Sequence, residues 1–275
     1  MSLIGLRRVL DDPEVLKELL KGDDDRSSIE RQELVLSLKK QAGAASLEGD
    51  LLRVDDCLSR VGADTADLPG IGCLARRNTA PEGTVTLVGR KTLLTAAHLV
   101  DETVKNWWFR PCQDATRGAK CAASRKVIRS LPHPTWMGAS GTDLALVFLE
   151  KDAQGPLVPA GEPTGDSVAG RFFGYGLVSN SDLSLGWKRV VEGFQASRDG
   201  NGMYVHPGHC LCSGDSGGPL VLDDGAGNVR VVAVNSGGGE TRGFCATQGR
   251  LTPLTAAHLD WIRAEMTAFG DPPGW

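Results

Sequence analysis

The feature that most constrains the fold of this chain is a succession of short β-rich runs between residues 71 and 234, each bounded by Gly, Pro, Asn or Asp. Many short strands at such spacing are typical of an all-β barrel or sandwich. The predicted strands cover residues 71–75, 84–88, 92–95, 126–128, 144–149, 171–173, 188–191, 219–222 and 229–234. A closing segment, residues 254–268, is predicted to be a helix.

The first 60 residues differ in composition from the remainder, with four of the 35 glycines and no aromatic side chain. Asp12-Pro13 supplies a helix cap followed by proline at the first helical position, and Ser27-Ser28-Ile29-Glu30 has the pattern of a capping box. A third stretch, between Leu47 and Leu58, places apolar residues on one helical face. These signals predict a small α-helical region at the N-terminus.

Charge and hydropathy exclude several classes of function for this chain of 275 residues. Its net charge of −4 indicates neither a nucleic-acid surface nor an anionic-membrane surface. No apolar stretch approaches the ~20 residues of a membrane span. The first residues are interrupted by Arg7 and Arg8 and do not resemble a signal peptide. We therefore expect a cytoplasmic protein, with secretion as the alternative if a leader precedes these residues.

The cysteine count argues against a full disulfide framework. There are seven cysteines, an odd number: Cys57, Cys73, Cys112, Cys121, Cys210, Cys212 and Cys245. Without a signal peptide, the expected state for most of them is a small buried side chain. The pair Cys210-x-Cys212 has no His or Cys partners nearby at zinc spacing, so we predict no metal site.

The strongest chemical signal is an octapeptide, Ser213-Gly214-Asp215-Ser216-Gly217-Gly218-Pro219-Leu220. A serine hydroxyl is a poor nucleophile until a base removes its proton, and neighbouring glycines let the backbone aim N–H groups at a developing oxyanion. The octapeptide resembles the nucleophile motif of the trypsin and chymotrypsin family of serine peptidases, and we expect a bacterial-type member of that family. The resemblance implies that Ser216 is the nucleophile and that the N–H groups of Gly214 and Ser216 form the oxyanion hole.

A second motif, Leu94-Thr95-Ala96-Ala97-His98, is similar to the context in which this family presents its general base. A neutral imidazole is suited to accept the serine proton near neutral pH and to return it later. The same four letters recur at Thr255-Ala256-Ala257-His258, before a segment that resembles the terminal helix of the family. Family chain order is His, Asp, Ser, so His98 is the predicted base and His258 a helix residue.

A third motif, Gly141-Thr142-Asp143-Leu144-Ala145-Leu146-Val147, places an acidic residue at the start of an apolar strand. Burial of a carboxylate requires a partner. The motif resembles the setting of the triad aspartate in the family, so Asp143 is predicted to orient His98 and stabilise the imidazolium. His133, between two prolines, is interpreted as a loop residue.

The resemblance also implies the substrate pocket. Val234-Asn235-Ser236-Gly237-Gly238 looks like the strand that binds substrate backbone, with Ser236 bonding to Asp143, Gly238 contacting substrate and the two glycines leaving the pocket mouth open. Cys210 occupies the pocket-base position, where trypsin-type enzymes have aspartate. We therefore expect a small or medium apolar residue before the scissile bond, unless Glu240 enters the pocket. Cys212 and Cys245 match positions that the family often joins by a disulfide, a bond that a cytoplasmic location disfavours.

Activation leaves two alternatives for Asp215. Many family members are cleaved to expose an N-terminal ammonium that pairs with the aspartate beside the catalytic serine. The nearest candidate here is Arg60-Val61-Gly62, which also fits an ordinary helix end. Otherwise Asp215, as activation partner, requires an internal cation such as an arginine.

Together these features predict a mainly β protein of two six-stranded antiparallel barrels with a C-terminal helix. A helical region at 1–62, with a regulatory, docking or pro-segment role, precedes a peptidase domain at 63–275. The predicted activity is that of a serine endopeptidase acting through an acyl-enzyme, without metal or organic cofactor. An esterase or lipase is the less favoured interpretation, because an α/β-hydrolase has the triad order Ser, Asp, His.

The predicted partner is a polypeptide, with no nucleic acid or membrane partner, and the oligomeric state stays open. The absence of a leader favours selective intracellular processing of a target such as a pro-effector or the tail of a ubiquitin-like protein. The alternatives are a catalytically silent binding module on the same fold and a secreted digestive protease.

Overall fold

The computed structural model describes residues 61–63, 68–76, 79–100, 106–138, 141–177, 185–207, 211–225, 227–238, 241–242, 245–246 and 248–275. The predicted helical region up to residue 60 and the predicted pocket-base residue Cys210 lie outside the described residues. Within the described part, the chain is almost entirely β, with a single α-helix, α6 (Ala256–Ala268), and a short 3-10 helix, η2 (Ala97–Leu99). No described helix is long and apolar enough to cross a membrane.

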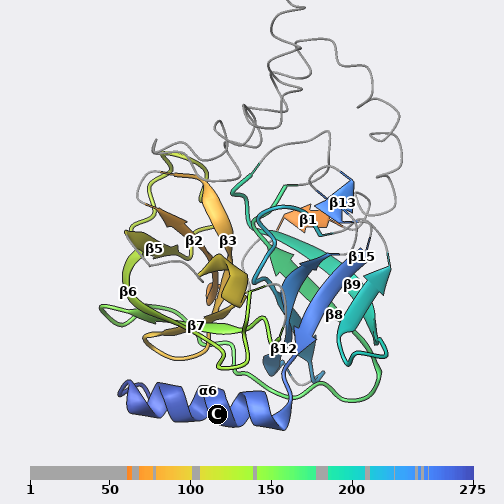
Figure 1. Cartoon of the computed structure of the whole chain (residues 1–275). Coiled ribbons are helices and arrows are strands. Elements are labelled where there is room, and N and C mark those ends of the chain that lie inside the picture. The colour runs from red at the N-terminus through yellow and green to blue at the C-terminus, as the bar shows by residue number, and fades with distance from the viewer. Residues whose placement is uncertain are drawn as a thin grey trace, which may run out of the picture.

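The first barrel closes through six antiparallel strands in the order β2-β3-β4-β7-β6-β5 (Figure 1). These strands are β2 (Ile71–Arg76), β3 (Pro81–Leu87), β4 (Thr92–Thr95), β5 (Trp107–Arg110), β6 (Arg125–Pro132) and β7 (Ala145–Leu149). Their inward side chains form a buried apolar cluster that includes Leu74, Val85, Leu93, Phe109 and Val147. Burial of these β-branched, aliphatic and aromatic side chains stabilises the barrel.

The second barrel closes through β9-β10-β15-β12-β11-β8, because β8 also pairs with β9. Its strands are β8 (Ser167–Gly174), β9 (Arg189–Arg198), β10 (Tyr204–Pro207), β11 (Pro219–Asp223), β12 (Val229–Gly238) and β15 (Gln248–Pro253). A short strand, β1 (Val61–Ala63), pairs with the start of β9, before the part that pairs with β10, and β13 (Thr241–Arg242) pairs with β14 (Cys245–Ala246). Phe172, Phe194 and Tyr204 are prominent in the core of this barrel.

The predicted fold of two six-stranded barrels and a C-terminal helix is therefore confirmed, with corrections to its elements. Strands β1, β5, β10, β13, β14 and β15 were not predicted, and most of the predicted strands are longer in the structure. The interpretation of Val61 and Gly62 as a helix end is wrong, since both lie in β1 and pair with Val191 and Val190 of β9. The predicted boundary between residues 62 and 63 falls inside β1.

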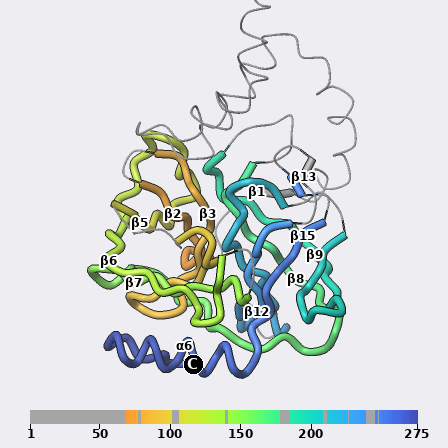
Figure 2. The backbone as a smooth tube through the Cα atoms, viewed as in Figure 1, coloured from red at the N-terminus to blue at the C-terminus, as the bar shows by residue number. Residues whose placement is uncertain are grey.

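A third apolar cluster joins the barrels to α6, which begins beneath the second barrel and runs beneath the first (Figure 2). Leu259, Ile262 and Met266 form the buried face of the helix. At its start, the Thr255 hydroxyl accepts from the backbone N–H of His258, and the His258 ring accepts from the backbone N–H of Thr255. This capping box confirms His258 as a helix residue.

The segment after α6 returns to the first barrel and holds the turn between β3 and β4. The buried carboxylate of Asp271 accepts hydrogen bonds from the backbone N–H of Arg90 (3.2 Å), the backbone N–H of Lys91 (2.8 Å) and the Thr92 hydroxyl (2.7 Å). The indole N–H of Trp275 donates to the carbonyl of Val88 at 2.8 Å. The turn that precedes β4 is therefore held by residues about 180 positions later in the chain.

Two disulfides between described residues correct the expectation of mostly reduced cysteines. Cys112 is bonded to Cys121, and Cys212 is bonded to Cys245. Cys73 is free and buried, as expected, and burial raises the pKa of its thiol to about 12. An odd number of cysteines leaves a thiol without an intramolecular partner but is compatible with several bonded pairs.

Candidate active site

The antiparallel pairing of β4 with β7 brings His98 close to Asp143. Thr95 at the end of β4 is paired with Ala145 at the start of β7. His98 follows Thr95 in η2, and Asp143 precedes Ala145, so both side chains emerge at the same edge of the first barrel. The local fold therefore juxtaposes two residues that are 45 positions apart.

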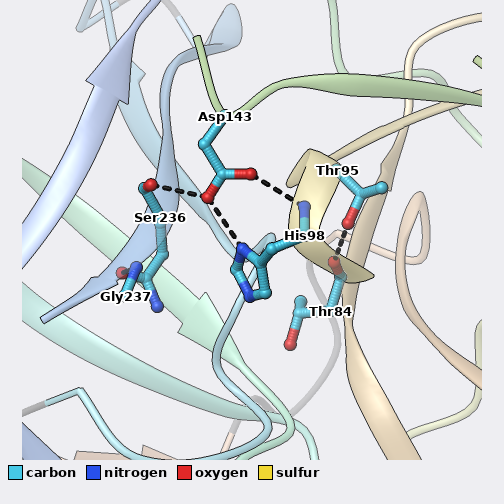
Figure 3. Close-up of polar contacts among 7 residues, drawn as sticks. Thr84, Thr95, His98, Asp143, Ser236 and Gly237 are labelled. Carbon is cyan, nitrogen blue, oxygen red and sulfur yellow. Dashed lines mark hydrogen bonds and ion pairs between the residues drawn. The ribbon is translucent and has the colours of Figure 1, made fainter. Parts of the chain in front are cut away.

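The Asp143 carboxylate accepts three hydrogen bonds (Figure 3). Its Oδ2 lies 2.7 Å from Nδ1 of the His98 ring, and its Oδ1 accepts from the backbone N–H of His98 at 2.9 Å. The hydroxyl of Ser236, on β12 of the second barrel, donates to Oδ2 at 2.6 Å. Residues from both barrels thus converge on one carboxylate.

The surroundings of Asp143 favour its charged form. Burial raises its pKa, but the hydrogen bond from His98, the nearby imidazole charge and the Ser236 hydroxyl together lower it, and the resulting pKa lies below the ordinary value. Only 4% of Asp143 is exposed. A buried carboxylate that stays ionised can fix the imidazole tautomer and stabilise a positive charge on the ring.

The loop that carries Ser216 is held by backbone hydrogen bonds. The N–H of Asp215 donates to the carbonyl of Cys212, and that of Gly217 donates to the carbonyl of Asn235 on β12. Gly214 has a φ of +94°, a left-handed conformation that favours glycine. The backbone N–H of Thr84 donates to the carbonyl of Ser216 at 2.8 Å, joining this loop to β3 of the first barrel.

A second bond continues from Thr84 to the histidine segment. The Thr95 hydroxyl donates to the carbonyl of Thr84 at 2.8 Å (Figure 3). Ser216, Thr84 and Thr95 therefore form a connected series that ends three residues before His98. In the described part of the chain, neither Oγ of Ser216 nor Nε2 of His98 takes part in a hydrogen bond.

Asp215, beside the predicted nucleophile, is also buried but bonds to backbone. Its carboxylate accepts from the N–H of Gly176 and the N–H of Cys212, each at 2.9 Å. Burial raises its pKa to about 7, against the lowering effects of these two bonds and the charge of Arg189. Two partners were predicted for Asp215, an ammonium at Val61 and an internal cation. Val61 is paired with Val191 in β1, and the charge of Arg189 lowers the pKa of Asp215.

The predicted pocket strand includes a bulge at its end. The pairing of β12 with β15 shifts between Asn235 and Gly237, and Gly237 has a φ of +120°. A β-carbon at Gly238 would overlap with the side chain of Ala246. Close packing therefore requires glycine at position 238. The sequence had suggested a different reason for this glycine, an open pocket mouth. With Cys210 and Glu240 outside the described residues, the preference for a small or medium apolar residue stays a prediction.

The rings of His133 and His258 contact each other, with centroids 5.3 Å apart. His133 is the residue after β6, as the loop interpretation expected, and its ring packs edge-on against Trp261 with centroids 4.7 Å apart. Burial, the larger effect for both, lowers the pKa of each histidine. Across the residues whose positions are described, no three His, Cys, Asp or Glu side chains gather in a group suited to a metal ion.

Comparison with known proteins agrees with this geometry. The protein-family model described as Trypsin matches residues 72–262. Two Drosophila melanogaster proteins, Serine protease 1 and Serine protease 2, are each 37% identical over 87 residues, which are 32% of this chain and 29% of the relative. The match thus spans less than a third of these relatives, and neither is bacterial. Because the family model covers more than half of the sequence, the chain belongs to the trypsin family.

Proposed function

We propose that this chain is a serine endopeptidase that hydrolyses peptide bonds through an acyl-enzyme. The observation that carries the proposal is the 2.7 Å contact between Nδ1 of His98 and the buried, ionised carboxylate of Asp143. This contact commits Nδ1 to the carboxylate and leaves Nε2 to act as the base. The series of hydrogen bonds through Thr84 and Thr95 supports the placement of Ser216 beside that histidine.

In this proposal the Ser216 hydroxyl attacks the scissile carbonyl while Nε2 of His98 takes its proton. Asp143 stabilises the resulting imidazolium, and the N–H groups of Gly214 and Ser216 donate to the oxyanion. His98 then returns the proton to the leaving amine. Water, deprotonated by the same histidine, releases the acyl group from Ser216.

A fluorophosphonate probe, which reacts with activated serines, tests the proposal. The intact protein is expected to be labelled and to cleave members of a peptide library, whereas Ser216→Ala loses both properties. Ser197→Ala, at an exposed position of β9, is the matched control and keeps them. Labelling that persists in Ser216→Ala would contradict the assignment of the nucleophile, and cleavage data would identify the residue preferred before the cut.

A catalytically silent binding module is the second candidate. It is favoured by one observation, namely that no described hydrogen bond joins Oγ of Ser216 to Nε2 of His98. Catalytic hydrogen bonds are often long before substrate binds, so the peptidase remains the better supported function. A protein that binds a peptide but resists the probe under all conditions would establish the silent module.

For the compartment, we favour the secreted alternative over the cytoplasmic one. Two described disulfides, Cys112–Cys121 and Cys212–Cys245, are the support, because such bonds persist in oxidising surroundings and are rare in the cytosol. Selective processing of a protein target remains a separate prediction. Quantifying free thiols in protein isolated without reductant tests this proposal. If all four of these cysteines react as free thiols, the secreted alternative is overturned.

A further inference from the structure

Thr84 is a fully buried residue in the middle of β3 whose side chain faces the other barrel. Its hydroxyl donates to the carbonyl of Gly214 at 3.0 Å and accepts from the backbone N–H of Tyr175 at 3.1 Å. A hydroxyl has one donor and two acceptor positions, so both bonds can exist together. The side chain of one first-barrel residue therefore joins two separate segments of the second barrel.

The backbone of Thr84 adds two more bonds at the same place. Its N–H donates to the carbonyl of Ser216, and its carbonyl accepts from the Thr95 hydroxyl (Figure 3). Thr84 thus holds the carbonyls of both residues whose N–H groups are the proposed oxyanion donors, Gly214 and Ser216. It is also joined to β4, the strand that leads to His98.

Two residues of the loop held by Thr84 are glycines, which have no side chain to fix their backbone. Gly214 and Gly217 both have positive φ values, +94° and +78°, and lack β-carbons that would restrict them. A β-carbon on Gly217 would overlap with the Thr95 hydroxyl and the Thr84 carbonyl. The loop therefore packs directly on the backbone of β3, where the Thr84 hydroxyl restricts rotation of the Gly214 carbonyl.

The bond to Tyr175 extends the effect to Asp215. Tyr175 immediately precedes Gly176, whose N–H donates to the Asp215 carboxylate at 2.9 Å. The Thr84 hydroxyl therefore contacts the segment that binds the Asp215 side chain and also the residue before Asp215. Both attachments restrict the backbone between Gly214 and Ser216.

We infer that Thr84 is a positioning residue for the oxyanion-binding loop, with its hydroxyl holding Gly214 in the orientation that stabilises a tetrahedral intermediate. The inference rests on the serine peptidase function proposed above. Loss of the hydroxyl leaves the Gly214 carbonyl and the Tyr175 N–H buried without this partner, so the loop must shift to satisfy them. Substrate binding outside the oxyanion site is not affected by that shift.

The test compares two isosteric changes on one strand. Thr84→Val removes the hydroxyl at nearly constant shape, and Thr86→Val makes the same change two residues along β3. Thr86 is equally buried, and its hydroxyl has no hydrogen-bond partner among the described residues, so it is a matched control. Thr84→Ser keeps a hydroxyl and should rescue activity.

We expect kcat of Thr84→Val to fall about tenfold or more with KM within about twofold, since loss of an entire oxyanion donor costs about 100-fold or more. Affinity for a peptide boronate, which forms a tetrahedral adduct with Ser216, should fall in parallel with kcat. Thr84→Ser and Thr86→Val should stay within about threefold of the parent in both measurements. Thermal unfolding confirms that each variant is folded, and Thr84→Ala replaces Thr84→Val if valine prevents folding.

Equal kinetics for folded Thr84→Val and Thr86→Val would overturn the inference while leaving the peptidase function intact. So would a rise in KM without a fall in kcat or in boronate affinity. A parent protein that neither cleaves peptides nor reacts with the fluorophosphonate probe would instead overturn the proposed function, and this assignment with it.

Discussion

Asp143 and Asp215 are two aspartates buried to a similar extent, 4% and 7% exposed, yet their surroundings act in opposite directions. Asp143 lies between the barrels and accepts bonds from an imidazole and a hydroxyl, and its pKa is lowered. Asp215 lies within the second barrel and, among the described residues, accepts bonds from the backbone N–H groups of Gly176 and Cys212, and its pKa is raised to about 7. Burial raises the pKa of both carboxyl groups. At Asp143 the bonds from His98 and Ser236 outweigh that effect, whereas at Asp215 the two backbone bonds and the charge of Arg189 do not.

This difference suits two separate tasks. A permanent negative charge at Asp143 can stabilise an imidazolium each time His98 accepts a proton. At Asp215 the carboxyl group mainly bridges Gly176 and Cys212, and it gains or loses its charge near neutral pH. Three substitutions test this difference between Asp143 and Asp215.

The largest effect is expected for Asp143→Asn. The carboxamide cannot hold the His98 tautomer that leaves Nε2 unprotonated, so kcat/KM should fall about 10⁴-fold, or about 5 kcal/mol of transition-state stabilisation. Steady-state peptide hydrolysis measures the loss. A variant with more than about a tenth of the parent activity would contradict the role of Asp143.

An intermediate effect is expected for Asp215→Asn, and it depends on pH. Since the pKa of Asp215 is raised in the folded protein, the folded state binds the proton more tightly than the unfolded chain. The free energy of unfolding of the parent should therefore fall relative to the variant by about 1.4 kcal/mol per pH unit between pH 5 and 7.

Urea denaturation of the parent and of Asp215→Asn at pH 5 and pH 8 measures how the free energy of unfolding depends on the Asp215 carboxyl group. The stability difference between parent and Asp215→Asn should shrink at the higher pH, where the parent buries a charged carboxylate. Asp152→Asn, at an exposed site whose side chain is 52% accessible, is the control and should show no such change. A difference independent of pH would show that Asp215 is ionised throughout.

The smallest effect is expected for Ser236→Ala, which removes a hydrogen bond from the Asp143 carboxylate but leaves His98 in place. The loss should be about 1 kcal/mol, or about fivefold in kcat/KM. A depressed carboxyl pKa contributes stability that is lost as pH falls through it, so the acid unfolding midpoint of the variant should move to higher pH. An unchanged midpoint would show that Ser236 does not support the charge on Asp143.

Much of the fold could be predicted from the chain because short β-rich runs and their turn residues are local signals. Strand β15 could not, since Gln248, Gly249 and Pro253 disfavour strands. Pairing with β10 and β12 supplies the hydrogen bonds that its residue types do not indicate. Long-range pairing overrides local preference here.

In the candidate site, too, some residues could be predicted from local sequence and others could not. His98, Asp143 and Ser216 stand in recognisable short motifs, so they could be proposed without a structure. The role inferred for Thr84 could not, because a threonine in an apolar run indicates only a strand, and its partner Gly214 is 130 residues away. The Cys112–Cys121 bond was missed for a related reason, as pairing depends on distances that cysteine positions do not reveal.

The attachment of Asp271 to the β3–β4 turn has a consequence for synthesis on the ribosome. All six strands of the first barrel are translated by residue 149, but the three hydrogen bonds that hold its turn become possible only when residue 271 has emerged. Domains generally fold as they leave the ribosome, N-terminal part first. Here the Asp271 bonds to the turn before the His98 strand form only after the whole second barrel, with Ser216, has been made, although β3 and β7 already pair with that strand.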